Sequence, residues 1–459
     1  MVAREYIQCE VCGTVTLLRV QLGQTIRRYS VQVPCGHCRI VMEAHVIQEE
    51  TTGTYDITFT NAQRWQEDPS AAYYLESSSE FITQKLVAYS DGLDERISPY
   101  MRASQDVGFS NFPLMMTLIN TVWQRSEDGW PRLRRIPQLY HAGSMDFLAN
   151  ELKHYIGNNP QLPLFNELDF FRAIHWILLR FWEPFVIGEP PLIEQALGIS
   201  KAISGYSAKQ ITEITTHFLA VLPDLDQEIS ERMAQFMHVA NTLVPAYTLQ
   251  FYSDVEANGH DILDKYGLST ARFEEVKGLY QDLFETIFRL SPLMVAHNNI
   301  IHRGSIDAMS EGFGRTTTIA QFTELRTGNK VDKLTNPKKP RETLDYLIEL
   351  PVSTALRNAI GHARWSYDPV SQLVTYDRGK SFLLEFALEV PHLLRAMLGL
   401  WELVYKTREW DYVSHGVLPS LDFSRLMTPS VLRNRGKDQQ RKSKKSIEKR
   451  NRKQSRRKR

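Results

Sequence analysis

Apolar and polar residues alternate with a period of two near the start of the chain, a pattern typical of β-strands. The alternating runs are Val15–Val20, Tyr29–Val33, Ile40–Ile47 and Tyr55–Thr60. They predict a small β-rich module that covers residues 1–62.

Beyond this module the apolar positions recur with the period of an α-helix. In a helical middle region, residues 67–222, the candidate helices are Ser78–Ser90, Met145–Ile156, Phe165–Phe185 and Ser207–Val221. In a second block, residues 225–425, they are Gln227–Val255, Thr270–Leu290, Arg341–Ala363 and Gly379–Lys406. Four long helices of this kind predict a C-terminal four-helix bundle. The loop from Arg303 to Pro340 is long enough to indicate a function of its own or ordering by a partner.

The predicted fold class is therefore mainly α, with a small β module at the N-terminus. Of the 459 residues, 42% are apolar and 23% are charged, which excludes collagen-like and globally disordered proteins. The most apolar stretch, Leu168–Ile187, is interrupted by five charged or histidine side chains, so it predicts a buried helix and not a membrane span. The first residues lack the apolar segment of a signal peptide. We expect a cytoplasmic protein without membrane contact.

The net charge of +1 conceals a strongly basic C-terminus. Between Arg433 and Arg459 there are 15 Lys or Arg residues and two acids, so residues 1–432 carry a net charge of −12. Ile447 is the one aliphatic side chain of this segment, and we expect residues 433–459 to form a disordered tail. Without aromatic residues, such a tail is expected to contact RNA, the ribosome or DNA through phosphates.

All four cysteines lie within the first 38 residues, as two Cys-x2-Cys pairs: Cys9 with Cys12, and Cys35 with Cys38. A disulfide framework would be spread along a chain of this length. Four thiolates complete the tetrahedral shell of Zn²⁺ and leave no open position, so the pattern predicts a structural zinc and resembles a zinc ribbon. Gly13 and Gly36 are expected to permit the turns.

Two interpretations of this module remain open. It either stabilises a domain too small to fold alone, or also contacts nucleic acid through Arg27, Arg28 and Tyr29 between the two pairs. His37, which lies inside the second pair, is expected to be a spectator because four thiolates already complete the shell.

The segment Leu350–Ala363 carries the most specific chemistry of the chain. As a helix it buries one apolar face and leaves Arg357, Asn358 and His362 on the other, beside Gly361. Arginine holds a phosphate through two hydrogen bonds, and histidine exchanges a proton near neutral pH. Metal-free cleavage of RNA by the neighbouring 2′-hydroxyl requires both of these properties.

An Arg followed by a His after four to six residues occurs six times in the chain, so the spacing alone is not diagnostic. The context Arg-Asn-Ala-Ile-Gly-His, residues 357–362, resembles the R-x4-6-H motif of the HEPN superfamily of helical nucleotide-binding and ribonuclease domains. The likeness covers about residues 341–406. It departs from the family in Pro351, which places a kink or a new helix start just before the motif.

This resemblance implies a HEPN-like bundle and a metal-independent endoribonuclease that works as a homodimer, often in toxin–antitoxin systems or antiviral defence. Arg357 would bind the scissile phosphate and His362 would be the general acid or base. Asn358 would orient the imidazole or contact phosphate. The products would carry a 2′,3′-cyclic phosphate and a 5′-hydroxyl.

The main alternative is a non-catalytic nucleic-acid- or ribosome-binding regulator that uses the bundle for dimerisation. A scaffold that senses a phage or stress component through the middle region is a third function. Three other groups of residues are candidates for function: the polar residues His297, Asn298, Asn299 and His302, the glycine-rich loop Gly304–Arg315, and the aromatic residues of Phe165–Phe185. For these we expect, respectively, residues that cap a helix or line a loop, a mobile loop, and a core or interface helix.

Overall fold

The computed structural model describes residues 1–49, 52–66, 70–90, 95–157, 164–252, 262–336, 338–350, 364–376 and 379–420. The chain forms two compact units. The first comprises Met1–Pro131, Met233–Asp282 and Ser353–Pro391, and the second comprises Arg132–Arg232, Leu283–Val352 and His392–Arg459.

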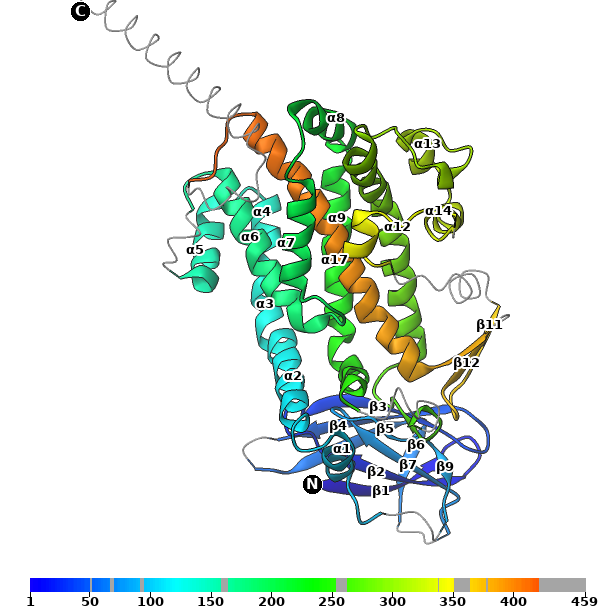
Figure 1. Cartoon of the computed structure of the whole chain (residues 1–459). Helices are drawn as coiled ribbons and strands as arrows, with labels where there is room; N and C mark the ends of the chain where they lie inside the picture. The colour runs from blue at the N-terminus through cyan, green and yellow to red at the C-terminus, as the bar shows by residue number, and fades with distance from the viewer. Residues whose placement is uncertain are drawn as a thin grey trace, which may run out of the picture. The chain divides into compact units, whose positions relative to one another are not determined.

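The first unit is built on a five-stranded sheet of N-terminal strands, coloured blue in Figure 1. Its strands are β6 (Ala62–Trp65), β1 (Val2–Cys9), β2 (Val15–Gln21), β7 (Tyr73–Ser78) and β9 (Val87–Ala88), in this spatial order. Neighbours are antiparallel except β2 and β7, which are parallel. Strand β2 is buried along its whole length because it lies in the centre of the sheet.

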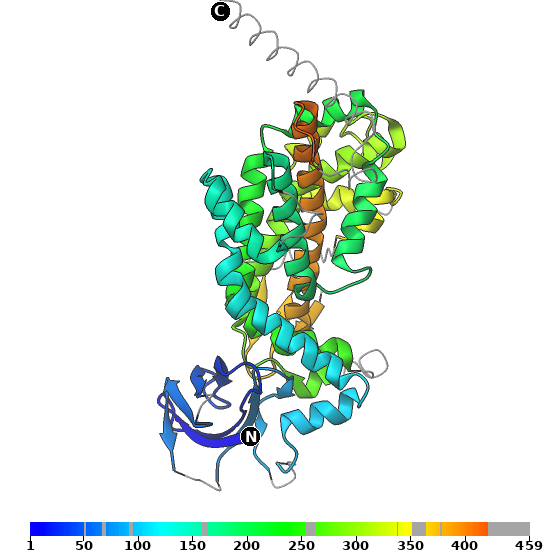
Figure 2. The same cartoon turned by 90° about the vertical axis from the view of Figure 1, so that its left-hand side faces the viewer.

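A second, antiparallel sheet consists of β3 (Arg28–Pro34), β4 (Val41–Gln48) and β5 (Tyr55–Thr60). In β4, Met42, Ala44 and Val46 are buried while Glu43 and His45 point to the other face, the alternation expected of a sheet with one face in the core. Its buried side chains share one apolar cluster with those of β1 and β2. Figure 2 shows the curvature of these N-terminal strands.

Shorter elements complete the first unit. Strands β8 (Thr83–Gln84) and β10 (Tyr266–Gly267) form a two-stranded sheet, and β11 (Trp365–Asp368), β12 (Leu373–Tyr376) and β13 (Gly379–Phe382) form an antiparallel sheet of three. The helices of this unit are α1 (Pro99–Val107), α2 (Phe112–Gln124), which continues as a π-helix over Arg125–Gly129, and α10 (Val244–Thr248). Helix α3 (Trp130–Leu133) spans the boundary between the two units, which lies between Pro131 and Arg132.

The described part of the second unit is helical (Figure 1). Its helices are α4 (Arg135–His141), α5 (Met145–Ile156), α6 (Glu167–Trp182), α7 (Leu192–Ile203), α8 (Ala208–Phe218), α13 (Ile319–Thr323), α14 (Thr327–Leu334) and α15 (Thr343–Leu347). The chain passes between the units within α9 (Leu222–Val239), α12 (Phe273–Arg303) and α17 (Leu383–Ser414). Side-chain caps mark several helix starts, as at α6, where the Asn166 side chain accepts a hydrogen bond from Asp169 N.

Buried charged groups join α6 to α17 in the second unit. His175 Nε2 lies 2.7 Å from Glu402 Oε2, and Ser200 Oγ donates to the other carboxylate oxygen of Glu402 at 2.8 Å. Lys406 Nζ lies 2.8 Å from Glu409, and both side chains are almost completely buried. A buried charge requires a partner at a fixed position, so the contacts of Glu402 with His175 of α6 and Ser200 of α7 help to specify how α17 packs on these helices, whereas the Lys406–Glu409 pair lies within α17.

The predicted fold class is wrong. The chain is 55% helical, its described strands form four separate sheets, and the β-rich N-terminal region spans about 90 residues instead of a small module. Within the predicted four-helix bundle, β11 to β13 lie between the expected third and fourth helices, and residues 351–363 of the expected third helix lie outside the described residues. Gly379, the predicted start of the fourth helix, belongs to β13, and α17 begins at Leu383.

The segment Ser78–Ser90 illustrates why the prediction failed. Its polar residues suggested the exposed face of a helix, but Ser78, Ser79 and Glu80 are at most 1% exposed. Ser78 Oγ accepts hydrogen bonds from the backbone N–H groups of Glu80 and Phe81, and Glu80 accepts one from Ile26 N at 3.0 Å. These polar side chains satisfy buried backbone groups, a role that a hydrophobicity pattern does not reveal.

Other predicted elements agree with the structure. The four N-terminal strands correspond to β2, β3, β4 and β5, and the helix Met145–Ile156 has the bounds of α5. The basic tail Arg433–Arg459 lies outside the described residues. None of the described helices combines the length and the apolar character needed to cross a membrane.

A buried cluster of one carboxylate and two guanidinium groups ties β2, β7 and α1 together. Glu76 of β7 is 2.9 Å from Arg19 of β2 and 2.6 Å from Arg102 of α1, and the Tyr74 hydroxyl donates to it at 2.7 Å. The Glu76 side chain is 1% exposed.

Replacing Glu76 by Gln leaves two cations without their counter-charge in a desolvated site. We expect Glu76→Gln to lower the free energy of unfolding by about 3 kcal/mol, measured by urea denaturation. The control is Glu49→Gln, which removes an exposed partner of Arg28 and should cost less than about 1 kcal/mol. Equal losses in the two variants would contradict a structural role of the buried cluster.

Candidate metal centre

The two Cys-x2-Cys pairs fold into loops with the same backbone hydrogen bonds. In the loop between β1 and β2, Gly13 N donates to Cys9 O at 2.9 Å and Cys9 N donates to Thr14 O at 3.0 Å. In the loop between β3 and β4, Arg39 N donates to Cys35 O at 2.9 Å and Cys35 N donates to Ile40 O at 2.8 Å. Each antiparallel hairpin therefore presents two thiols from one tight turn.

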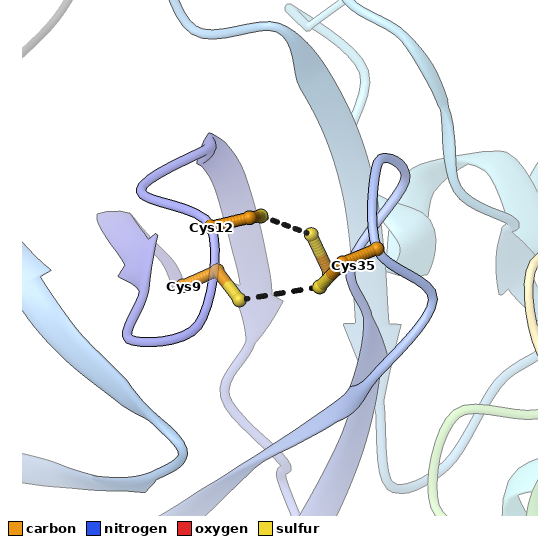
Figure 3. A group of neighbouring side chains, drawn as sticks. Cys9, Cys12 and Cys35 are labelled. Atoms are coloured by element: carbon orange, nitrogen blue, oxygen red, sulfur yellow. Dashed lines mark hydrogen bonds between the residues drawn. The ribbon is translucent and has the colours of Figure 1, made fainter.

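The four sulfur atoms converge on one point. They all lie within 4.8 Å of one another, with 3.4 Å between Cys12 and Cys35 and 3.7 Å between Cys9 and Cys38. Figure 3 shows Cys9 and Cys12 on one loop facing Cys35 on the other. A tetrahedral ion with metal–sulfur bonds of about 2.3 Å requires sulfur–sulfur distances of about 3.8 Å. The four cysteines are thus positioned to hold a metal ion, as predicted.

The thiols are not paired as disulfides, and their environments differ. A hydrogen bond with the Thr14 side chain, with help from the neighbouring thiols, lowers the pKa of Cys12 to about 6. Burial raises the pKa of Cys35 to about 12. Without a cation, four crowded thiols therefore cannot all ionise, whereas metal binding would displace the remaining protons.

The centre joins the two sheets of the first unit. Cys9 ends β1 of the five-stranded sheet, and Cys35 follows β3 of the three-stranded sheet. Both cysteines belong to the apolar cluster that these sheets share and are 1% and 0% exposed, while Cys12 and Cys38 lie at the surface. An ion at this position would cross-link two hairpins at the edge of their common core.

The two glycines predicted to permit the turns have different roles. Gly13 adopts the left-handed backbone conformation, with φ of 75°, and in the second loop the equivalent position is Arg39, with φ of 64°. Gly36 is required for a different reason: there is no room for a side chain, because a Cβ atom there would lie 2.3 Å from the ring of Tyr73. The Arg39 side chain contacts Asp368 at 3.2 Å, a contact that the sequence did not suggest.

The residues proposed for nucleic-acid contact near the cysteines are only partly available. Arg28 is exposed, but the hydroxyl of Tyr29 donates to Gln21 O at 2.9 Å and its ring packs against the apolar cluster. Tyr29 is therefore not a free stacking surface. His37 is exposed and does not belong to the group of possible metal ligands, in agreement with a spectator role.

The predicted catalytic residues Arg357, Asn358 and His362 lie outside the described residues. In the described segment before them, residues 342–344 form hydrogen bonds and an ion pair with side chains of α12. Asn298 accepts a hydrogen bond from Leu344 N at 3.0 Å, His302 Nε2 accepts one from Thr343 N at 3.2 Å, and Arg303 pairs with Glu342. Asn298 and His302 thus cap α15, as expected.

His297, also on α12, is fully buried against Tyr206 and Trp410. Burial lowers its pKa to about 3, so it stays neutral near pH 7 and does not serve as a proton donor there.

In the glycine-rich loop, Phe313 is buried and its carbonyl accepts a hydrogen bond from Lys333. Gly312 lies against Lys339, so this part of the loop is packed. The aromatic side chains of α6 include the buried Phe171, Phe181 and Trp182, which makes α6 a core helix.

The chain matches none of the protein-family models, curated proteins or solved structures with which it was compared.

The geometry predicts that the four thiols act as one binding site. Purified protein should bind one equivalent of a thiophilic divalent metal, measured by elemental analysis, and Cys35→Ser should lose it because three thiolates leave the shell incomplete. His37→Ala, a change in the same loop, should retain it. Retention of a full equivalent in Cys35→Ser would contradict this assignment.

Proposed function

We propose that Cys9, Cys12, Cys35 and Cys38 hold one structural Zn²⁺. Four sulfur ligands at these separations suit the tetrahedral preference of zinc, and thiolates favour zinc over hard cations such as Mg²⁺. Four protein ligands leave no position for water or substrate, so the ion would stabilise the fold. What supports a stabilising role is the place of the site, where the two hairpins share their apolar cluster.

Zinc identity and role are tested together by elemental analysis and chelation. We expect one zinc ion per protein chain. Its removal should lower the free energy of unfolding of the first unit by at least about 4 kcal/mol, the stabilisation from a ligand present at about 1,000 times its Kd. Stability unchanged after complete removal would contradict a structural role.

We further propose that the protein acts on RNA as a metal-independent endoribonuclease of the HEPN type. The observation that carries this proposal is the sequence Arg-Asn-Ala-Ile-Gly-His at residues 357–362. Arg357 would hold the scissile phosphate, His362 would transfer the proton, and Asn358 would orient the imidazole. Homodimer formation and a role in defence or toxin-like RNA cleavage belong to the same proposal.

Two features of the described residues support this choice of chemistry. His175 and His297 are buried, at 7% and 0% exposure, and are poorly placed to meet RNA. The proposed zinc shell has no open position. These two histidines and the cysteine centre are therefore poor candidates for the proposed acid–base chemistry, which is assigned to Arg357 and His362 from the sequence.

The test is cleavage of labelled RNA in the presence of EDTA, added after folding, with the metal content of the protein measured afterwards. We expect wild-type protein to give 2′,3′-cyclic phosphate ends, His362→Ala to cleave roughly 10²–10⁴ times more slowly, and Arg357→Ala roughly 10²–10³ times more slowly. The control is His415→Ala directly after α17, an exposed histidine paired with Asp411, which should leave the rate unchanged.

The outcome that would overturn the nuclease is binding without cleavage in all four proteins. The protein would then be a non-catalytic RNA- or ribosome-binding regulator. This second candidate is favoured by the basic tail, because 13 excess positive charges on a chain that is otherwise acidic are suited to phosphate contacts. Absence of both binding and cleavage would remove RNA as the partner.

A further inference from the structure

Residues 132–157 of the second unit, which comprise the end of α3 and helices α4 and α5, carry a local excess of positive charge. Residues 132–157 contain four Lys or Arg and two acids, plus His141 and His154, whereas residues 1–432 as a whole are acidic. Arg132, Arg134, Arg135 and Lys153 are all exposed. One of the two acids, Glu151, forms an ion pair of 3.2 Å with Arg135, which offsets its charge.

Exposed aromatic side chains gather in the same stretch. Phe147 is 70% exposed and Tyr155 is 38% exposed, both on α5, and Phe165 just before α6 is 83% exposed. In the described part of the second unit, the one other large aromatic residue exposed by more than a third is Tyr346. Exposed aromatic rings are unfavourable in water, so a concentration of them indicates a contact surface.

The cations and the rings lie on neighbouring positions. Phe147, Glu151 and Tyr155 are four residues apart and share one face of α5, which places the two rings about 12 Å apart along the helix. The ion pair between Arg135 and Glu151 brings α4 to this face. Arg132, Arg135 and Glu151 are also the charged groups that act on the Tyr155 hydroxyl, whose pKa is raised mainly by partial burial. We call Arg132, Arg134, Arg135, Phe147 and Tyr155 the basic aromatic surface.

We propose that the basic aromatic surface binds single-stranded RNA. The guanidinium groups of Arg132 and Arg134 contact phosphates, and the rings of Phe147 and Tyr155 stack on bases. Single strands fit better than duplexes because only unpaired bases offer their faces to exposed rings. An acidic protein would satisfy the cations but would leave the rings without planar partners. The inference rests on the proposed action on RNA and adds a surface that retains the strand.

The experiment measures binding of a short labelled oligouridylate to the full chain by fluorescence anisotropy at several salt concentrations. A 2′-O-methylated oligonucleotide is used, because the proposed cleavage needs a free 2′-hydroxyl and therefore cannot consume the probe. The basic tail is present in every variant and contributes equally.

We expect Arg132→Ala with Arg134→Ala to weaken binding about tenfold and to reduce the slope of log Kd against log salt by about 1 to 2. The matched control is Lys201→Ala with Lys209→Ala, which removes two exposed charges from α7 and α8 and should change Kd less than twofold. Phe147→Ala and Tyr155→Ala should each weaken binding about fivefold or more without changing the salt slope. Phe109→Ala, at a 97% exposed ring in the first unit, should have no effect.

Each outcome separates the two proposals. If wild-type protein binds or cleaves RNA and all three variants of the surface bind like the controls, the surface is wrong while the RNA function stands. If the arginine double variant weakens binding of RNA and of polyglutamate equally and the ring variants weaken neither, the surface is a general polyanion site and the inference is overturned. If wild-type protein neither binds nor cleaves RNA, the proposed function fails first. Circular dichroism of each variant identifies any loss of folding, and an unfolded variant is replaced by Arg→Gln or Phe→Leu at the same position.

Discussion

The crowding of four thiols at the edge of the N-terminal core is the constraint on which this part of the structure depends. Sulfur atoms within 4.8 Å of one another would repel if all were ionised, and two of the four belong to buried cysteines. The proposed divalent cation would remove this repulsion and link the two hairpins. The cross-link would act where β1 and β3 contribute to one apolar cluster, and would thereby stabilise the core that the two sheets share.

Buried charges impose a comparable constraint elsewhere. Glu76 lies between two guanidinium groups in the first unit, and in the second unit Glu402 and Glu409 of α17 meet His175 and Lys406. Each buried charge loses its hydration and must find its partner at a defined place. Buried pairs of this kind leave few alternative ways to pack the helices. Such a restriction suits α12 and α17, because each of these long helices contains a proline in its interior.

The proposals assign separate tasks to separate parts of the chain. The cysteine centre would hold the fold together, residues 357–362 would carry the chemistry, and the basic aromatic surface and the tail would retain RNA. The separation has a physical basis, because a closed thiolate shell offers neither an acid nor a base, while exposed guanidinium groups and rings bind a strand without reacting with it.

The sequence by itself determined features that depend on local spacing. The two Cys-x2-Cys pairs predicted the metal ligands, period-two alternation located β2 to β5, and a helical period located α5 with its bounds. Tertiary structure decided what the pattern could not express. Ser78 and Glu80 look like surface residues but satisfy buried backbone groups, and Gly36 is needed because the Tyr73 ring, 37 positions later, lies against it. Likewise, exposed residues of α4 and α5 form one surface only because the helices pack together. These features depend on which distant residues meet, and a pattern read along one chain carries no such information.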